Sequence, residues 1–288
     1  MCGNLLIIVV VSSSRSLHSP MYFFLTQLSV SDILLTTTIV PNMLHTLLCD
    51  GSSMSLVGCL IQYHFFVASE VLETLLLTVM SYDRYQAICN PLHYYMVMNP
   101  TCCLWLLALV WLVIFVVILV TSVTMSHLQF CGPNIIDHFF CDRDPILELS
   151  CSDTFIIETE SLIFMIPLAI FPSIIILISY IYIIITIMKI HSNTGKQKTF
   201  STCSSHLAVV FIYYGSTMSI YLFPRKITAK KIPSLLYIVV TPLLNPIIYS
   251  LANRDIIDAF RNLLSKMSSN NRSLEQVDPA LGILEPSR

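Results

Sequence analysis

The chain has 288 residues, of which 55% are hydrophobic and only 11% are charged, and its formal net charge is −2. A soluble domain carries about a quarter charged residues, so this composition excludes an ordinary soluble protein. A net charge this close to zero gives no electrostatic basis for a nucleic-acid partner. We therefore predict a polytopic membrane protein.

Seven apolar runs predict an all-α membrane protein, a seven-transmembrane helix bundle. A helix needs about 20 apolar residues to cross the hydrocarbon core, and the first run has only about half of that length. We expect that Met1 is not the natural start, that a groove beside the second and seventh helices is unfilled, and that restoring the missing part improves surface expression. No signal peptide is recognisable before Cys2. The runs are 1–11, 22–48, 58–82, 104–123, 159–188, 200–223 and 234–251.

One charge pair marks the end of the third run. Asp83 and Arg84 are adjacent, where an apolar helix that begins near Cys59 meets water. Positions 59 and 84 are 25 steps apart (84 − 59), or roughly 38 Å at 1.5 Å per residue, about one bilayer with its interfaces. An Arg there needs a counter-charge or solvent, and Asp83 is a partner that a conformational change could remove. The pair predicts a switch; the alternative is an interfacial Arg that only extends to water.

The distribution of Lys and Arg predicts the orientation. If the Arg84 end of the third helix is cytosolic, ten basic residues lie inside and five outside, which predicts an extracellular N-terminus. The loop after the fourth helix is then extracellular and acidic. Five cysteines also lie outside, where disulfides are expected for most of them, although the sequence does not pair them and one must remain over. These five are Cys49, Cys59, Cys131, Cys141 and Cys151.

Four sequence blocks together carry a family resemblance. They are LHSPMYFFL at 17–25, SYDRYQAICNP at 81–91, KTFSTCSSHL at 198–207 and PLLNPIIY at 242–249. With these blocks the chain resembles the vertebrate olfactory (odorant) receptors, which are rhodopsin-like G protein-coupled receptors. Between Phe200 and Leu222 the sixth run lacks the mid-helix proline of most rhodopsin-like receptors and has Tyr213-Tyr214-Gly215 instead, which resembles the odorant receptors' own motif.

The resemblance implies a function and a domain organisation. Residues 1–267 would form the receptor domain, with an interfacial eighth helix at 254–267, and 268–288 a disordered cytosolic tail. The expected function is odorant binding within the bundle and activation of a stimulatory, olfactory-type G protein that raises cAMP, at the plasma membrane of olfactory sensory neuron cilia. The partners implied are a small odorant, the heterotrimeric G protein and membrane lipids. Gln86 and Ala252 depart from the family pattern.

The resemblance also implies the disulfide pairs. Cys59 would pair with Cys141 and Cys131 with Cys151, which leaves Cys49 unpaired. The first bond would hold the loop after the fourth helix over the mouth of the third helix. His138 and Cys141 resemble a proposed soft-metal site for sulfur odorants, but a Cys141 in a disulfide is not available as a thiolate.

The odorant cavity is expected between the third, fifth, sixth and seventh helices. Glu70 is the most specific candidate, because its carboxylate would favour amines or strong hydrogen-bond donors; alternatively it stays protonated, bonded to a helix carbonyl or coupled to Glu73. Tyr221 could instead anchor in the headgroup region. The expected ligand-binding residues are Phe66, Val67, Glu70, Val71, Phe164, Tyr214, Tyr221, Tyr237 and Ile238.

A second set of residues is expected to couple the bundle to the G protein. In related receptors Arg84 separates from Asp83 and meets the G protein while the sixth helix moves outward. The prolines of the seventh helix permit a kink there. The expected switch residues are Asp83, Arg84, Tyr85, Tyr180, His206, Asn245, Pro246 and Tyr249.

Two acids inside the membrane require an explanation, because a buried charge is costly. Asp32 and Glu73 match family positions that lie against each other, near Asn4 and Asn245. They predict either a sodium site or a shared proton without metal. A proton path of a transporter, with Glu70, is a third interpretation, but the sequence contains no repeated half. No arrangement of nucleophile and base, phosphate loop or zinc-ligand spacing supports an enzyme. A non-signalling truncated receptor product is the other alternative function.

Overall fold

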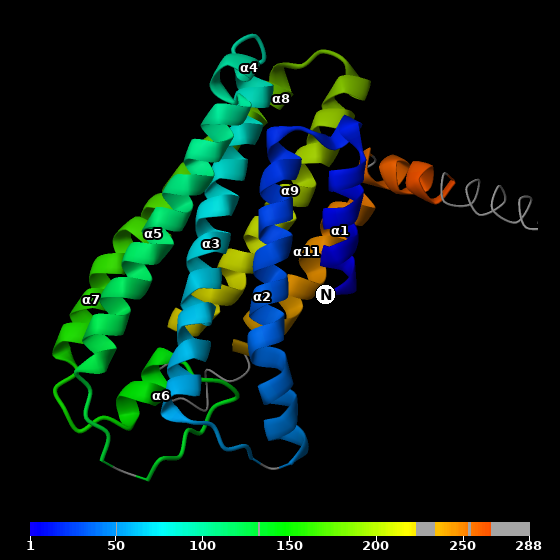
Figure 1. Ribbon diagram of the computed structural model, residues 1–288. Helices are drawn as coiled ribbons and strands as arrows, with labels where there is room; N and C mark the ends of the chain where they lie inside the picture. The colour runs from blue at the N-terminus through cyan, green and yellow to red at the C-terminus, as the bar shows by residue number, and fades with distance from the viewer. Residues whose placement is uncertain (50, 132, 223–233, 253–254, 266–288) are drawn as a thin grey trace, which may run out of the picture.

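The protein is described by a computed structural model that covers residues 1–49, 51–131, 133–222, 234–252 and 255–265. Within these ranges the regular structure is helical, and its one β-bridge joins Phe130 to Ser150. The long helices run side by side along one axis, with longer loops gathered at the end that also holds α6 (Figure 1). The prediction of an all-α membrane protein is confirmed.

Seven helical rods make up the part of the bundle that the structure describes. Short elements lie between them: η1 (Arg15–Leu17), α4 (Tyr94–Val97) and α6 (Arg143–Glu148). The rods are α1 (Cys2–Ser13), α2 (Pro20–Leu48), α3 (Leu56–Cys89), α5 (Pro100–Ser126), α7 (Phe155–Met165) continued by η2 (Ile166–Ile170) and α8 (Phe171–Lys189), α9 (Asn193–Leu222), and η3 (Leu236–Val240) continued by α11 (Thr241–Ala252).

Helices α3 and α5 begin before the apolar runs that predicted them, and each is preceded by a polar capping residue. The Ser55 hydroxyl accepts a 3.1 Å hydrogen bond from the backbone N–H of Gly58 and so starts α3. The Asn99 side chain accepts a 2.8 Å bond from the N–H of Cys102 at the start of α5, just before Pro100. Capping satisfies backbone donors that have no partner within the helix, and hydropathy alone does not detect it.

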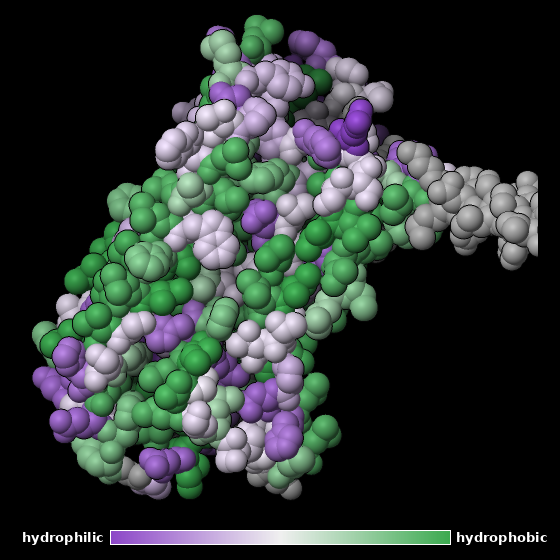
Figure 2. All heavy atoms as spheres, in the orientation of Figure 1, coloured by the Kyte–Doolittle hydropathy of each residue, from purple (hydrophilic) through white to green (hydrophobic). Residues whose placement is uncertain are grey.

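The sides of the bundle expose many large apolar residues, which would be unfavourable in contact with water. Among the described residues, four helices are long and apolar enough to cross a membrane, and a bent pair including Leu236–Ser250 would add a fifth. In the span Phe155–Lys189 only 11% of the most apolar stretch is buried inside the protein. Hydrophobic residues cover most of the middle of the face in Figure 2, and hydrophilic ones gather towards the two ends. Lipid is the solvent that such a surface requires.

Helix α3 is the central rod, in contact with α2, α5 and α8. The sequence predicted that Arg84 lies at the end of this helix. In the structure the helix continues to Cys89, so Arg84 lies more than one turn inside it. The chain after it turns through Asn90 and forms the short helix α4 at Tyr94. This extension holds Asp83 and Arg84 on rigid backbone.

Two rods contain π-helical turns, where the helix is wider by one residue per turn. One is η2, which contains Pro167, and the other is η3, which comes directly before Thr241 and Pro242. A proline removes a backbone hydrogen-bond donor, and π-helical turns are frequent at functional sites. Both turns lie next to the polar interior described below.

A wide apolar groove of about 800 Å³ opens beside α1. It lies against α2 and α11, where the sequence predicted a groove beside the second and seventh helices. Its lining residues are Met1, Gly3, Leu6, Thr36, Thr37, Val40, Pro41, Leu44, Val239, Pro242, Leu243, Pro246, Ile247 and Ser250.

The expected eighth helix is present over Asp255–Ser265. Ile256 and Ala259 are buried on one face, whereas Arg261 is exposed on the other, as an interfacial helix requires. The Tyr22 hydroxyl at the start of α2 donates a 3.1 Å hydrogen bond to Asp255 and ties this helix to the bundle. The ends predicted for this helix and the predicted tail at 268–288 lie outside the described residues.

Gly3 allows α1 to approach α11 closely, and its replacement is expected to destabilise the fold. A Cβ on Gly3 would lie 2.9 Å from Cβ of Pro246, a rigid ring that cannot move aside. We expect Gly3→Ala to lower the free energy of unfolding by about 1–3 kcal/mol, the usual cost of overpacking. The measurement is thermal unfolding of the detergent-purified chain.

Gly215 in α9 provides the matched control, because a Cβ there meets nothing within 4 Å. Gly215→Ala should leave stability unchanged or raise it by about 0.5–1 kcal/mol, since Ala favours a helix. Equal destabilisation by both substitutions would contradict the packing explanation.

Candidate functional site

A cavity lies inside the bundle, at the end that also holds α6. The cavity has a volume of about 220 Å³ and lies between α3, α5, α7, η2 and α9. It lies next to the loop 127–154, which joins α5 to α7, contains α6 and is called the lid below. The volume is below the roughly 300–1,000 Å³ typical of sites for drug-sized ligands, so a small molecule fits it best.

Two disulfides hold the lid. Cys59 near the start of α3 is bonded to Cys141, with their Cα atoms 5.4 Å apart, and Cys131 is bonded to Cys151, with 6.0 Å between Cα atoms. These are the pairs that the family resemblance implied. Cys49 is free and exposed. Because Cys141 is bonded, the soft-metal interpretation of His138 and Cys141 lacks its thiolate.

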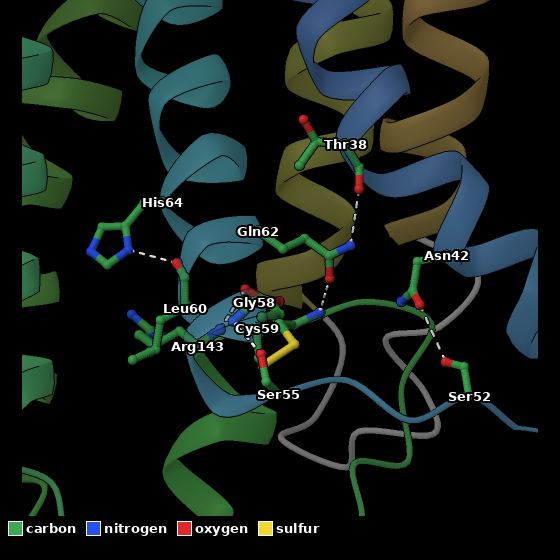
Figure 3. Close-up of a disulfide and its surroundings, with 12 residues drawn as sticks. Thr38, Asn42, Ser52, Ser55, Gly58, Cys59, Leu60, Gln62, His64 and Arg143 are labelled. Atoms are coloured by element: carbon green, nitrogen blue, oxygen red, sulfur yellow. Dashed lines mark hydrogen bonds between the residues drawn. A yellow bond between two sulfur atoms is a disulfide. The ribbon is translucent and has the colours of Figure 1, made fainter.

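Gln62 is a second anchor of the lid that the sequence did not reveal. Its amide nitrogen donates to the Thr38 carbonyl of α2 at 3.1 Å, and its oxygen accepts from the backbone N–H of Cys141 at 2.9 Å. Figure 3 shows the side chain reaching from α3 towards both partners beside the disulfide. The one sequence signal for this role is that Gln62 lies one helical turn after Cys59 and so on the same face of the helix.

Six of the nine expected ligand-binding residues line the cavity. Tyr237 and Ile238 do not: both are 1% exposed in the core, and the Tyr237 hydroxyl donates a 3.4 Å bond to Glu73. The π-helical turn η3 decides this, since it changes which side chains of the rod face the cavity. The side chain of Tyr221 lies outside the described residues. The six are Phe66, Val67, Glu70, Val71, Phe164 and Tyr214.

The structure adds polar groups to the cavity wall that the sequence did not assign to it. Arg143 pairs with Asp144 through two bonds of 3.0 and 2.9 Å, and its backbone N–H donates to Asp142. Burial raises the pKa of Asp142 above its usual value, against the lowering effect of that backbone bond. The added lining residues are Tyr63, Thr74, Val117, Thr121, Asp142, Arg143, Asp144, Glu160, Ser161, Met165, Leu168, Ala169, Tyr213, Thr217 and Met218.

A polar cluster lies deeper in the bundle and brings together the two expected acids. The Asn245 amide nitrogen lies 3.2 and 3.3 Å from the two carboxylate oxygens of Asp32 and 3.3 Å from an oxygen of Glu73. Asn4 lies beside Asp32 and donates to the Pro242 carbonyl, while its own oxygen has no hydrogen-bond partner among the described residues. The cluster therefore joins α1, α2, α3 and α11.

The opposite end of α3 holds the expected charge pair. Arg84 and Asp83 form a 3.1 Å ion pair, in which the Asp83 side chain is fully buried and Arg84 is 14% exposed. The Tyr94 hydroxyl donates a 2.8 Å hydrogen bond to the other oxygen of Asp83. The pair is thus held from outside the helix by α4, a contact that the sequence did not predict.

Two other helices meet near this charge pair. The rings of Tyr180 and His206 stack with centroids 5.9 Å apart, and the Tyr180 hydroxyl lies 2.6 Å from His206 Nδ1, which links α8 to α9. Tyr249 of α11 is completely buried, and Tyr85 packs against Tyr182 of α8. The expected switch residues therefore lie on four helices, α3, α8, α9 and α11.

These features define a polytopic all-α membrane protein with a small cavity under a disulfide-anchored lid and a charge pair at the other end. Its sequence matches the olfactory receptor family over residues 1–267. The chain belongs to the olfactory receptor family, which consists of G protein-coupled receptors and not of enzymes.

Individual relatives agree with this assignment. Human olfactory receptor 7D2 is 45% identical over 271 residues, which cover 93% of this chain and 86% of the relative. Human olfactory receptor 10A7 is 44% identical over 267 residues, covering 92% and 84%. Olfactory receptor 1M1 of Mus musculus is 43% identical over 272 residues, covering 93% and 87%.

We expect the lid disulfide to be required for stability and surface expression, whereas Cys49 should not be required. Loss of the Cys59–Cys141 bond in Cys141→Ser should lower stability by about 2–4 kcal/mol, the usual contribution of a disulfide. Surface expression and thermal unfolding of the full chain measure the effect. Cys49→Ser is the control and should leave both unchanged. Mass spectrometry that finds Cys49 bridged to Cys59 would contradict the pairing.

Proposed function

We propose that this protein is an odorant receptor that binds small odorants in the cavity beneath the lid and activates a stimulatory, olfactory-type G protein that raises cAMP. The observation that carries the proposal is the small cavity itself, which is lined by aromatic and aliphatic side chains together with polar and charged groups and is bordered by an anchored loop. Such a site suits a small organic ligand.

The contacts of Tyr213 support a route from the cavity to the sixth rod. Its hydroxyl bonds the Thr74 hydroxyl and donates a 3.1 Å bond to the Glu70 carbonyl, so a cavity-lining residue of α9 is attached to α3. Its ring meets that of Tyr237, whose hydroxyl bonds Glu73. A ligand that displaces Tyr213 would therefore loosen α9 from α3 and from η3 together.

The other end of the bundle offers the site for the G protein. Arg84 is held by Asp83, and His206 of α9 is held by Tyr180 of α8. An outward movement of α9 would separate Tyr180 from His206 and open a path to Arg84. The G protein would then stabilise the open state, because it binds that state only.

We also propose that the receptor lies in the plasma membrane of olfactory sensory neuron cilia with its N-terminus extracellular. The excess of Lys and Arg at the Arg84 end supports this orientation. The two disulfides of the lid support it as well, because disulfides persist on the oxidising side of the membrane.

Odorant-evoked cAMP in cells that express the chain tests the function, and Arg84→Ala tests the route. We expect the variant to lower the cAMP response by about tenfold or more while odorant binding is kept, since a charge lost from an interface costs about 2 kcal/mol or more. Arg15→Ala, an exposed basic residue of η1 near the same end, is the matched control and should respond as wild type.

Two results would count against the receptor proposal. One is an odorant response that is unchanged in Arg84→Ala. The other is a flux of ions or solute that does not depend on G protein, which is the result expected of a proton-coupled or ion-coupled transporter.

The polar cluster around Asp32 and Glu73 is proposed to hold a sodium ion. Two carboxylates and the Asn4 oxygen, which has no hydrogen-bond partner in the described part of the chain, are hard oxygen ligands close together in a buried site, so the residues fit this ion. The ion would balance the charge of the carboxylates, which is costly to bury. A proton shared between the acids is the alternative.

Replacement of sodium chloride by choline chloride distinguishes the two. If sodium is bound, the melting temperature of the purified chain should fall, by about 2–4 °C for each kcal/mol of binding free energy lost. In the double variant Asp32→Asn, Glu73→Gln this dependence should vanish. A wild-type melting temperature that is equal in both salts favours the shared proton.

A further inference from the structure

The cavity carries an excess of negative charge. Among its described lining residues are four carboxylates, Glu70, Asp142, Asp144 and Glu160, and one cation, Arg143. Arg143 already forms an ion pair with Asp144 at 2.9 Å, and its backbone N–H donates a hydrogen bond to the Asp142 carboxylate. The only cation of the described lining therefore forms its ion pair within the lid, and it forms no ion pair with Glu70 or Glu160.

Glu70 presents an available carboxylate. It lies on α3 one turn from Glu73, and its backbone carbonyl is held by both Thr74 and Tyr213. Its side chain makes no hydrogen bond or ion pair with any residue whose placement is described, in contrast to Glu73, which is bonded to Asn245 and Tyr237. The backbone is thus fixed while the carboxylate is free to meet a ligand.

Glu160 supplies a second carboxylate from another wall. It lies in α7, and its Oε2 atom is shielded from solvent and has no hydrogen-bond partner within the described part of the chain. A carboxylate oxygen that has lost water and gained no donor is costly. A donor from a bound ligand would remove this cost. Glu70 and Glu160 would therefore both be stabilised by a ligand that donates hydrogen bonds.

Apolar groups make up much of the remaining wall and define the rest of the ligand. Phe66 and Val71 of α3, Val117 of α5, and Phe164 and Leu168 of the fifth rod line the same cavity. Aliphatic and aromatic side chains favour a hydrocarbon body, and aromatic rings also attract a cation. The cavity of about 220 Å³ restricts this body to a compact one.

We propose that the cavity binds compact protonated amines, with the Glu70 carboxylate as the charge partner of the ammonium group and Glu160 as an additional acceptor. The proposal names the ligand class of the odorant site and so rests on the proposed function. It assigns to Glu70 the determination of specificity between amines and neutral odorants. An amine is protonated at neutral pH, as the Lys side chain is, so it brings both a charge and several donors.

The experiment compares pairs of ligands that differ only in charge: cyclohexylamine with cyclohexanol, and isopentylamine with isopentanol. Two readouts are used, the cAMP response of cells that express the full chain and the thermal stabilisation of the purified full chain by each ligand. The second readout does not depend on a G protein, because a ligand that binds the folded state raises its stability.

Glu70→Gln keeps the size of the side chain and removes the charge. We expect it to raise the amine concentration needed for half-maximal effect by about tenfold or more, since loss of one partner of a desolvated charge pair is costly. The alcohols should be affected by less than about threefold, because they form no ion pair with the carboxylate. Glu160→Gln should weaken amines in the same direction by a smaller factor.

Glu158→Gln is the matched control on the same helix, since Glu158 is exposed, bonds the Thr154 hydroxyl and does not line the cavity. It should change neither ligand class. Surface staining of all variants establishes that each is folded and delivered.

The outcomes separate this proposal from the receptor function. If alcohols are at least as potent as amines in the wild type, or if Glu70→Gln affects both classes equally or not at all, the amine proposal is overturned while odorant signalling stands. That result would favour a Glu70 that is protonated or coupled to Glu73. If amines stabilise the wild type but not Glu70→Gln and no cAMP follows, amine recognition stands and the G protein proposal fails. If no probe gives either effect, the amine proposal is overturned, and the receptor function is decided by the test with Arg84→Ala.

Discussion

The hydrocarbon of a bilayer offers no hydrogen bonds, and this constraint governs the whole molecule. Each backbone donor and acceptor must be satisfied within the chain, which leaves helices as the form of every described rod. Side chains that are polar must likewise find partners inside the bundle. Asn245 shows the result: one amide reaches both Asp32 and Glu73 and so joins α2, α3 and α11 at their centre. The polar interior is at once the costliest part of the fold and the part that fixes how the helices meet.

The two ends of α3 connect this interior with the two surfaces of the bundle. At the lid end, the disulfide from Cys59 and the amide of Gln62 hold the loop that closes the cavity. At the other end, Asp83 is buried between Arg84 and Tyr94. Between them, Tyr213 of α9 is attached to α3 through Thr74 and the Glu70 carbonyl. Helix α3 therefore connects the lid, the cavity and the charge pair, and α9 is attached to it beside the cavity.

Membership of the olfactory receptor family gives the general function, and the cavity wall gives this chain its individual chemistry. The family resemblance extends over the motifs at 17–25, 81–91, 198–207 and 242–249, which lie mostly towards one end of the bundle and in its core. The carboxylates of Glu70 and Glu160 stand outside these motifs and face the cavity instead. Selection among ligands depends on such positions, because specificity is a difference between the affinities of competing ligands in one pocket.

The sequence by itself determined the class of protein and its helical rods, because hydropathy and local motifs depend on neighbours along the chain. Helical spacing along α3 also orders Phe66, Val67, Glu70 and Val71 on one face, which lines the cavity. Only the tertiary structure decided the rest. The π-helical turn η3 directed Tyr237 and Ile238 into the core, and the fold of the lid brought Arg143 and Asp144 to a cavity wall that begins on another helix. Gln62 acquires its partner, and Glu160 its place in the cavity, from segments distant in sequence, which no local pattern encodes. Tyr94 reaches Asp83 because the chain turns after α3 and brings α4 back against it.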